Sequence, residues 1–187
     1  IKYDSKLLID EAHAFGVMGP EGRGESFGLK EPISIISGTF GKAFGSGGAF
    51  LATDKITGEN LIQNCGAFRY TTALAPPLCA SALAALNLIE SNPNWGSELK
   101  EKSKALRDRL SQVGWQRPAG EGPIISIILG SDRLAMDYQE RLEAQGLLTV
   151  AIRPPTVPEG KSRLRLVIRR NTPDQAFERL IEILKNK

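Results

Sequence analysis

The sequence of 187 residues has few of the side chains that most often bind metals or form disulfides. It contains one histidine and two cysteines, and Cys65 and Cys79 lack the spacing of a metal site or a redox pair. Aromatic residues make up only 6% of the chain, and 24 Lys and Arg residues are nearly balanced by 21 Asp and Glu residues. This composition argues against a metal centre and against a nucleic-acid-binding protein, in which basic residues gather on one face.

Long apolar runs are also missing. No segment approaches the roughly 20 apolar residues that are needed to span a bilayer, so we expect no membrane segment. The few cysteines are typical of a reduced, cytoplasmic protein. Hydrophobic residues still make up 41% of the chain, which is enough for the core of one ordinary domain or two small ones. Because an apolar strand pattern follows closely on Ile1, we expect the chain to be a fragment of a longer protein.

The first part of the sequence predicts strands that end in polar residues. Apolar runs at 7–9 and 33–36 lack alternation, as strands buried on both faces do, and 47–54 is a third strand candidate. The first run ends in Asp10, and the second leads into a glycine-rich loop that contains Lys42. These features predict an α/β sheet.

Polar residues at two neighbouring strand ends indicate a site. In open α/β sheets, ligands bind in the crevice at the carboxyl ends of the strands. Asp10, His13 and Lys42 are therefore expected to meet there, with Thr39 and Ser37 just before the lysine.

The rest of the chain alternates between helices and strands. Helices are predicted over 76–90 and 97–113, because apolar residues recur there at helical spacing. A linker at 114–123 separates these helices from a block with the order β-α-β-β-α. Its elements are predicted at 124–130, 132–145, 147–153, 163–169 and from 172 onward.

The last helix carries a specific start signal. Thr172 and Gln175 have the spacing of a capping box, and Pro173 suits the first helical position. We therefore predict that the Thr172 side chain caps this helix.

The segment 37–48, SGTFGKAFGSGG, excludes the two common nucleotide-binding loops. A P-loop needs a hydroxyl residue after the lysine and a glycine six residues before it, but Ala43 and Ile36 occupy these positions. The dinucleotide fingerprint can begin at Gly45, yet Phe50 stands where its third glycine belongs. The lysine therefore needs another explanation.

A lysine amine can form a Schiff base with an aldehyde cofactor such as pyridoxal phosphate (PLP). A PLP site also needs a carboxylate for the ring nitrogen, hydroxyls for the phosphate and a hydrogen-bond partner for the phenolic oxygen. Asp10, Ser37, Thr39 and His13 supply these groups around Lys42. The residues alone leave simpler interpretations open, since the lysine can be a solvated surface residue and the histidine a structural one.

Four segments resemble those of the α-oxoamine synthases, a family of PLP-dependent enzymes, and they occur in the family's order. They are LLIDEAHAFGVMGPEGRG from residue 7, GTFGKAFGSGG from 38, FRYTTALAPP from 68 and AIRPPTVPEGKSRLRL from 151. The resemblance implies PLP fold type I, the α/β fold of aspartate aminotransferase. Residues 1–113 would then be the C-terminal part of the large PLP-binding domain with a linking helix, and 114–187 the small C-terminal α+β domain.

The resemblance also assigns cofactor roles. Lys42 would form the Schiff base and later remove the Cα proton, and Asp10 would pair with the pyridine nitrogen. His13 would hydrogen-bond the phenolic oxygen, and Thr39 would hold the phosphate. The family's N-terminal half, which carries the residue that stacks on the ring, is not part of this sequence. We therefore expect the fragment alone to be inactive.

Further residues match family positions that bind substrate or a second subunit. Thr71 and Thr72 would reach the phosphate of the neighbouring subunit, which implies a homodimer with shared active sites. Thr156 would contact substrate, and Arg165 would bind the carboxylate of the amino acid, as the fork of a guanidinium suits.

The family joins an amino acid to an acyl thioester with loss of CO₂. The wording at 151–158, AIRPPTVP, favours members that use L-alanine and a pimeloyl thioester of coenzyme A or a carrier protein in biotin biosynthesis. The alternatives are another α-oxoamine synthase, such as 2-amino-3-ketobutyrate ligase or serine palmitoyltransferase, and a non-catalytic partner subunit. The presence of Lys42 argues against the partner subunit. Arg169 and Arg170 depart from the family pattern, and they either alter the substrate entrance or form a solvated strand end.

Overall fold

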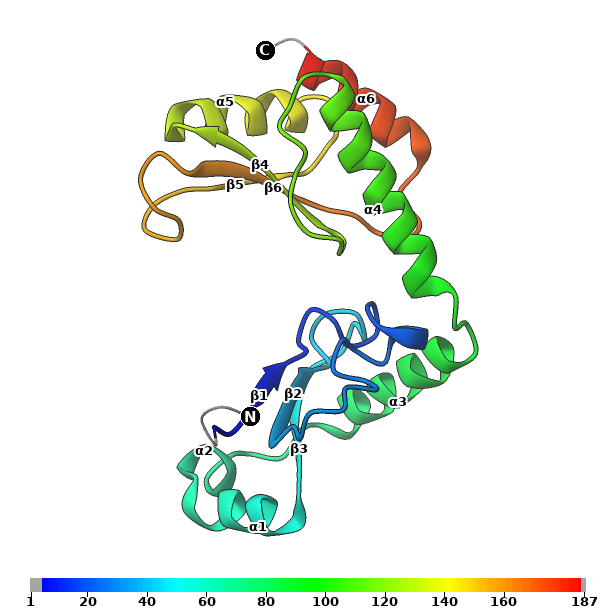
Figure 1. The fold of residues 1–187 in the computed structure, drawn as a ribbon, viewed down its shortest axis with the longest axis vertical. Helices are drawn as coiled ribbons and strands as arrows, with labels where there is room; N and C mark the ends of the chain where they lie inside the picture. Colours follow the sequence, from blue (N-terminus) through cyan, green and yellow to red (C-terminus); the bar gives the residue numbers. More distant parts are fainter. Residues whose placement is uncertain (1–4, 186–187) are drawn as a thin grey trace. The chain divides into compact units, whose positions relative to one another are not determined.

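The computed structural model describes residues 5–185 and divides into two compact units between Ser97 and Glu98 (Figure 1). The division falls near the start of helix α4 (Trp95–Gln112). Most of α4 belongs to the second unit, because Leu106 and Leu110 are buried in that unit's core. The predicted boundary after residue 113 lies at the other end of this helix, and the assignment of two domains stays a prediction.

The first unit contains a three-stranded sheet in the order β1-β2-β3. Strand β1 (Leu8–Asp10) pairs in parallel with β2 (Ile35–Thr39), and β3 (Ala49–Thr53) pairs antiparallel with β2. The positions of the strands predicted from the apolar runs are thus confirmed, but β1 is not buried on both faces, since Leu8 is 58% exposed. Asp10 lies opposite Ser37, so the carboxyl ends of β1 and β2 are at the same edge.

The first unit also contains a 3₁₀ turn between β1 and β2 and three helices after β3. They are η1 (Pro20–Gly22), α1 (Lys55–Asn64), α2 (Gly66–Arg69) and α3 (Pro76–Glu90). The predicted helix over 76–90 is confirmed, and its first residues are prolines. Helix α1 was not expected. It begins after Asp54, whose carboxylate accepts hydrogen bonds from the N–H (2.9 Å) and the hydroxyl (2.7 Å) of Thr57.

The second unit contains an antiparallel sheet in the order β4-β6-β5. Its elements are β4 (Ile124–Gly130), α5 (Asp132–Glu143), β5 (Val150–Ile152), β6 (Ser162–Val167) and α6 (Asp174–Lys185). This is the predicted β-α-β-β-α order, although β5 is shorter than expected. Figure 1 shows α5 running along one side of the sheet.

One hydrophobic core holds the second unit together. Helices α4, α5 and α6 bury apolar side chains against alternating residues of β4 and β6. The core residues are Leu106, Leu110, Ile125, Ile127, Tyr138, Leu142, Leu164, Leu166, Ile168, Phe177, Leu180, Ile181 and Leu184. The opposite face of the sheet carries Arg163 and Arg165 on the central strand, where both are half-buried.

The predicted capping box at the last helix does not form. The Thr172 hydroxyl instead accepts a hydrogen bond from the Arg169 N–H at 3.1 Å, and helix α6 begins at Asp174. The backbone turn at 169–172, closed by the Thr172 N–H and the Arg169 carbonyl, brings the hydroxyl to the strand end rather than to the helix. The local turn has therefore overridden the capping signal.

Candidate functional site

Two consecutive carboxylates at the end of β1 have different surroundings. Asp10 is exposed, and its carboxylate accepts a hydrogen bond from the Ala12 N–H at 2.8 Å. Glu11 is only 2% exposed, and its carboxylate accepts hydrogen bonds from the N–H groups of Ser26 (2.6 Å) and Glu25 (3.1 Å). Asp10 thus remains available to a ligand, whereas Glu11 ties the strand end to the loop at 24–26.

Sequence reasoning missed the role of Glu11. A signal was present, because successive residues of a strand point to opposite sides, so an acidic pair at a strand end divides between two environments. Gly24 fits closely against this carboxylate: its φ is +94°, and a Cβ there would lie 2.8 Å from Cδ of Glu11. The contact requires glycine at this position.

Lys42 is exposed in the loop between β2 and β3, and Thr39 closes this loop. The Thr39 hydroxyl donates to the carbonyl of Gly48 (3.0 Å) and accepts from the N–H of Gly41 (3.1 Å). Within the loop, the N–H of Gly45 donates to the carbonyl of Lys42 (3.0 Å). The lysine therefore stands on a hydrogen-bonded turn.

Four phenylalanines pack beside this loop. Phe44 is 4% exposed and stacks on Phe15, with ring centroids 4.8 Å apart. Phe40 contacts Phe44 and Phe50 at centroid distances of 5.3 Å and 5.5 Å, and Phe15 contacts Phe50 at 5.3 Å. Because Phe40 and Phe44 lie two residues on either side of Lys42, the cluster anchors the loop on both flanks of the lysine.

A cavity of about 550 Å³ in the first unit is lined by five of the residues that the sequence predicted for the site. Asp10 and Thr39 line it from the strand ends, and Thr71 and Thr72 line it from the segment before α3. The hydroxyls of these last two residues form no hydrogen bond with any residue in the described part of the chain. One carboxylate and two available hydroxyl donors therefore face one space.

Two other predicted residues are not among those that line this cavity. Lys42 is exposed in the adjacent loop, and His13 is exposed in the turn that follows Asp10. Ser37, which the sequence also suggested, does line it.

The predicted substrate residues belong to the second unit. Thr156 is exposed in the turn after the cis Pro154–Pro155 peptide bond, and its N–H donates to the carbonyl of Arg153 at 3.0 Å. Arg165 lies on β6 between Ser126 of β4 and Val150 of β5.

Residues 5–185 contain no cluster of three or more His, Cys, Asp or Glu side chains arranged to bind a metal ion. None of their helices combines the length and apolar character that crossing a membrane requires.

The geometry of the candidate site agrees with the protein family that the chain matches. Residues 2–184 match the family described as aminotransferase class I and II. The chain therefore belongs to the aminotransferase class I and II family. Its fold class is the one predicted, the PLP fold type I of α/β enzymes.

Individual relatives show which enzymes within this family the chain resembles. The 8-amino-7-oxononanoate synthase of Methylobacillus flagellatus is 40% identical over 185 residues, which are 98% of this chain and 47% of that protein. The enzyme of the same name from Lysinibacillus sphaericus is 36% identical over 186 residues, which are 98% of this chain and 48% of that protein. The predicted resemblance to α-oxoamine synthases is thus confirmed. The chain spans about half the length of the curated relatives it matches.

Solved structures give the same result. The 8-amino-7-oxononanoate synthase of Francisella tularensis has a TM-score of 0.85 at 29% identity, over 96% of this chain and 54% of that one. The serine palmitoyltransferase of Sphingomonas wittichii has a TM-score of 0.89 at 26% identity, over 98% of this chain and 47% of that one. A further structure with the same TM-score is described as SPT with PLP.

Proposed function

We propose that this chain carries part of the active site of a PLP-dependent acyltransferase. The reaction condenses L-alanine with a pimeloyl thioester, of coenzyme A or a carrier protein, and releases CO₂ to give 8-amino-7-oxononanoate in biotin biosynthesis. The observation that carries this proposal is that Asp10 and Thr39 line one cavity at the carboxyl ends of β1 and β2, one loop away from Lys42. The names of relatives at 36% and 40% identity support the choice of reaction.

The residues present fit PLP chemically. An exposed carboxylate at a strand end suits a protonated ring nitrogen, and the free hydroxyls of Thr71 and Thr72 suit a phosphate, which accepts hydrogen bonds. Thr39 fits with a condition, because its only proton is donated to the carbonyl of Gly48. To bind phosphate, the Thr39 hydroxyl must turn away from that carbonyl.

Bound PLP would supply an electron sink for the negative charge that develops on Cα of the amino acid. The Nζ of Lys42 would anchor the cofactor covalently and, once displaced by the amino acid, would take the proton from Cα. The carboxylate of Asp10 would hold the proton on the ring nitrogen. His13 would hold the phenolic oxygen by a hydrogen bond.

Substrate binding falls to the second unit in this proposal. The guanidinium of Arg165 would bind the carboxylate of L-alanine in a bidentate pair, and Thr156 would contact the substrate. Thr71 and Thr72 would serve the phosphate of a second subunit, so we propose a homodimer with shared active sites. Because the matched relatives are about twice as long, we also propose that these 187 residues alone have no turnover.

A second candidate is a serine palmitoyltransferase-like reaction with another amino acid and acyl group. The observation in its favour is that structures of that enzyme superpose with a TM-score of 0.89. The curated relatives have higher identity, so the biotin-pathway reaction is the preferred proposal.

The cofactor lysine can be tested by chemical trapping. The protein is incubated with PLP, reduced with borohydride and digested, and the modified peptide is located by mass spectrometry. We expect the phosphopyridoxyl group on Lys42 and its loss in Lys42→Arg. Lys55→Arg is the matched control, since Lys55 is an exposed lysine on α1. Labelling that persists in Lys42→Arg at another lysine would contradict the proposal.

The reaction itself is tested in the protein as its gene encodes it. Alanine, glycine and serine are each assayed with pimeloyl, acetyl and palmitoyl thioesters. Turnover restricted to alanine with the pimeloyl thioester is expected, whereas a preference for serine with the palmitoyl thioester would favour the second candidate.

A further inference from the structure

Glu11 is a buried acid that the proposed reaction does not use. It is 2% exposed, and it forms no ion pair within residues 5–185. Its Oε1 accepts a hydrogen bond from the N–H of Ser26 (2.6 Å), and its Oε2 accepts one from the N–H of Glu25 (3.1 Å). A buried carboxylate is costly unless hydrogen bonds compensate it, and here both oxygens serve as acceptors. The side chain is therefore fixed in one place by its two oxygens.

The main chain of Glu11 is fixed as well. Its N–H donates to the carbonyl of Ser37 on β2 at 2.8 Å. Its carbonyl accepts hydrogen bonds from the N–H groups of Ala14 (2.9 Å) and Phe15 (2.7 Å). Glu11 therefore joins three segments, which are strand β2, the turn at 11–15 that carries His13, and the loop at 24–26.

The same turn orients the neighbouring acid. The carboxylate of Asp10 accepts a hydrogen bond from the N–H of Ala12 at 2.8 Å, and both residues line the cavity of the candidate site. Ala12 lies inside the turn that the Glu11 carbonyl closes. The direction of the Asp10 carboxylate therefore depends on a turn that is anchored through Glu11.

The buried side of the strand end accepts glutamate and not aspartate. Successive residues of a strand point to opposite sides, so a shift of β1 by one residue would turn Asp10 away from the cavity. Aspartate is one methylene shorter than glutamate, so Asp10 on the buried side would fall short of the two N–H groups. Gly24 leaves no spare room there, since a Cβ on it would lie 2.8 Å from Cδ of Glu11. The fit of Glu11 thus favours the observed register, in which Asp10 lies opposite Ser37.

We propose that Glu11 is a positioning residue for the contact with the cofactor ring: its buried carboxylate locks the strand end so that Asp10 faces the cavity. The inference rests on the proposed function, in which Asp10 holds the proton on the ring nitrogen of PLP. Glu11 is not among the residues that line the cavity, so it acts through Asp10 and the turn at 11–15. Weakening its two hydrogen bonds should therefore weaken the hold of the ring nitrogen on its proton.

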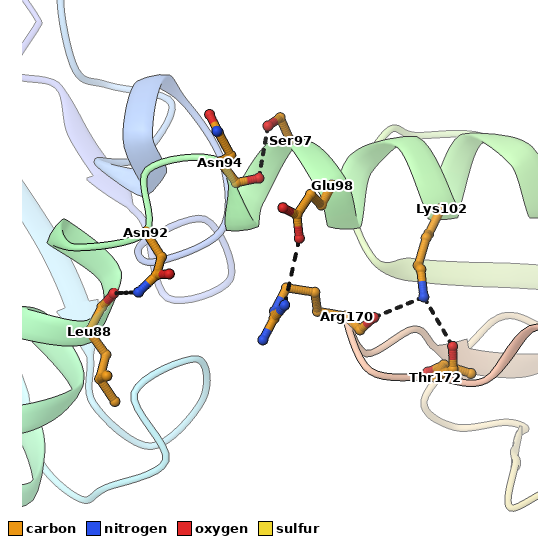
Figure 2. Close-up of polar contacts among 8 residues, drawn as sticks. All are labelled: Leu88, Asn92, Asn94, Ser97, Glu98, Lys102, Arg170 and Thr172. Carbon is orange, nitrogen blue, oxygen red and sulfur yellow. Dashed lines mark hydrogen bonds and ion pairs between the residues drawn. The ribbon is translucent and has the colours of Figure 1, made fainter.

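The test uses the protein as its gene encodes it, loaded with PLP that carries ¹⁵N in the ring. The ¹⁵N chemical shift, followed against pH, gives the midpoint at which the ring nitrogen loses its proton. Asp10→Asn should lower this midpoint most. Glu11→Gln replaces one acceptor oxygen by an N–H donor, so it should lower the midpoint by about one pH unit, or tenfold, which is the size of one lost hydrogen bond. The matched control is Glu98→Gln, which should leave the midpoint unchanged, because Glu98 pairs with Arg170 at 3.6 Å in the second unit (Figure 2).

A second variant reaches the same contact from the other side. Gly24→Ala places a Cβ against the Glu11 carboxylate, and it should lower the midpoint in the same direction. Gly28→Ala, whose added Cβ meets no atom within 4 Å, should leave the midpoint unchanged. Before PLP is added, amide hydrogen exchange of 11–15 should become severalfold faster in Glu11→Gln and Gly24→Ala and stay the same in Glu98→Gln.

The outcomes distinguish a failure of this role for Glu11 from a failure of the proposed function. Faster exchange at 11–15 with an unchanged midpoint would make Glu11 purely structural and overturn the inference, and so would an equal shift of the midpoint in Glu98→Gln. If Asp10→Asn lowers the midpoint and Glu11→Gln does not, the proposed function stands and the inference fails. If the ring nitrogen carries no proton in the unmodified protein, or keeps it in Asp10→Asn, the role of Asp10 in the proposed function is wrong, and the inference falls with it.

Discussion

The two units of this chain are stabilised in different ways. The second unit encloses a core of leucine, isoleucine and aromatic side chains between three helices and a sheet. In the described part of the first unit, Phe44 and Ala82 are the buried hydrophobic residues, and apolar side chains of α1 and α3 such as Ile56 and Leu83 are 80% and 60% exposed. An exposed apolar surface of this kind marks a contact surface.

Strand pairing, hydrogen bonds and ring contacts take the place of a large core in the first unit. Its order comes from strand pairing, the Glu11 carboxylate, the phenylalanine cluster and turns built on glycine. The unit with an enclosed core thus carries the arginine side chain proposed to bind substrate. The unit that carries Lys42 instead exposes apolar surface of the kind that packs against other polypeptide. This agrees with a chain that spans about half the length of its relatives.

The largest effect is expected in the core of the second unit. Leu164→Ala removes a fully buried side chain of β6 and should lower the free energy of unfolding by about 2–5 kcal/mol. Leu83→Ala, at an exposed site on α3, should change it by less than about 0.5 kcal/mol. Urea unfolding monitored by circular dichroism measures both. A Leu83→Ala cost as large as that of Leu164→Ala would break the distinction between the units.

An intermediate effect is expected at the Glu11 contact of the first unit. Gly24→Ala should destabilise it by about 1–3 kcal/mol, because alanine there is strained at a φ of +94° and meets the buried carboxylate. Gly28→Ala is the matched control: its φ is +83°, but no atom lies within 4 Å of the added Cβ. Amide hydrogen exchange across 11–28 reports the change. Equal effects of the two variants would mean that only backbone strain matters.

The smallest effect concerns how the units respond to pH. Hydrogen bonds from Thr57 lower the pKa of Asp54 below its usual value of 3.8. The carboxylate therefore stabilises the start of α1 above pH ~4, and this contribution is lost as the pH falls through the lowered pKa. Helix α5 is capped instead by Ser131, whose uncharged hydroxyl accepts a hydrogen bond from the N–H of Leu134 at 3.2 Å.

The pH comparison is measured by amide shifts of Thr57 and Leu134 between pH 2 and pH 6. The amide shift of Thr57 should change with pH as the Asp54 carboxylate is protonated. The Ser131 hydroxyl that caps α5 does not ionise, so it should cause no change in the amide shift of Leu134. Asp54→Asn keeps a capping oxygen without the charge, so it should abolish the titration at Thr57. A titration that persists in Asp54→Asn would point to another acid.

The periodic elements could be predicted from the sequence because their side chains alternate between core and solvent. Helix α6 and strand β6 show this most clearly. Helix α1 escaped prediction because none of its residues is buried, so its apolar residues form no stripe. The cap predicted at Thr172 does not form, because the Thr172 hydroxyl accepts a hydrogen bond from Arg169 within the turn instead.

The residue types of the candidate site could be predicted from the sequence, whereas most of their contacts could not. Asp10 and Lys42 follow strands, and that position is visible in the sequence. The burial of Glu11 and the use of the Thr39 proton by Gly48 both depend on segments distant in the sequence. The ion pair of Arg170 likewise depends on Glu98, more than seventy residues away.

The phenylalanines on either side of Lys42 have a further consequence for motion. Phe40 and Phe44 hold the backbone at two points, and the turn between them is closed by the Gly45–Lys42 hydrogen bond. The conformational freedom that remains at this position belongs to the four-carbon side chain. In the proposed reaction, the amine would therefore move between the cofactor and Cα of the amino acid by rotation about its own torsions, while the main chain that bears it keeps one shape.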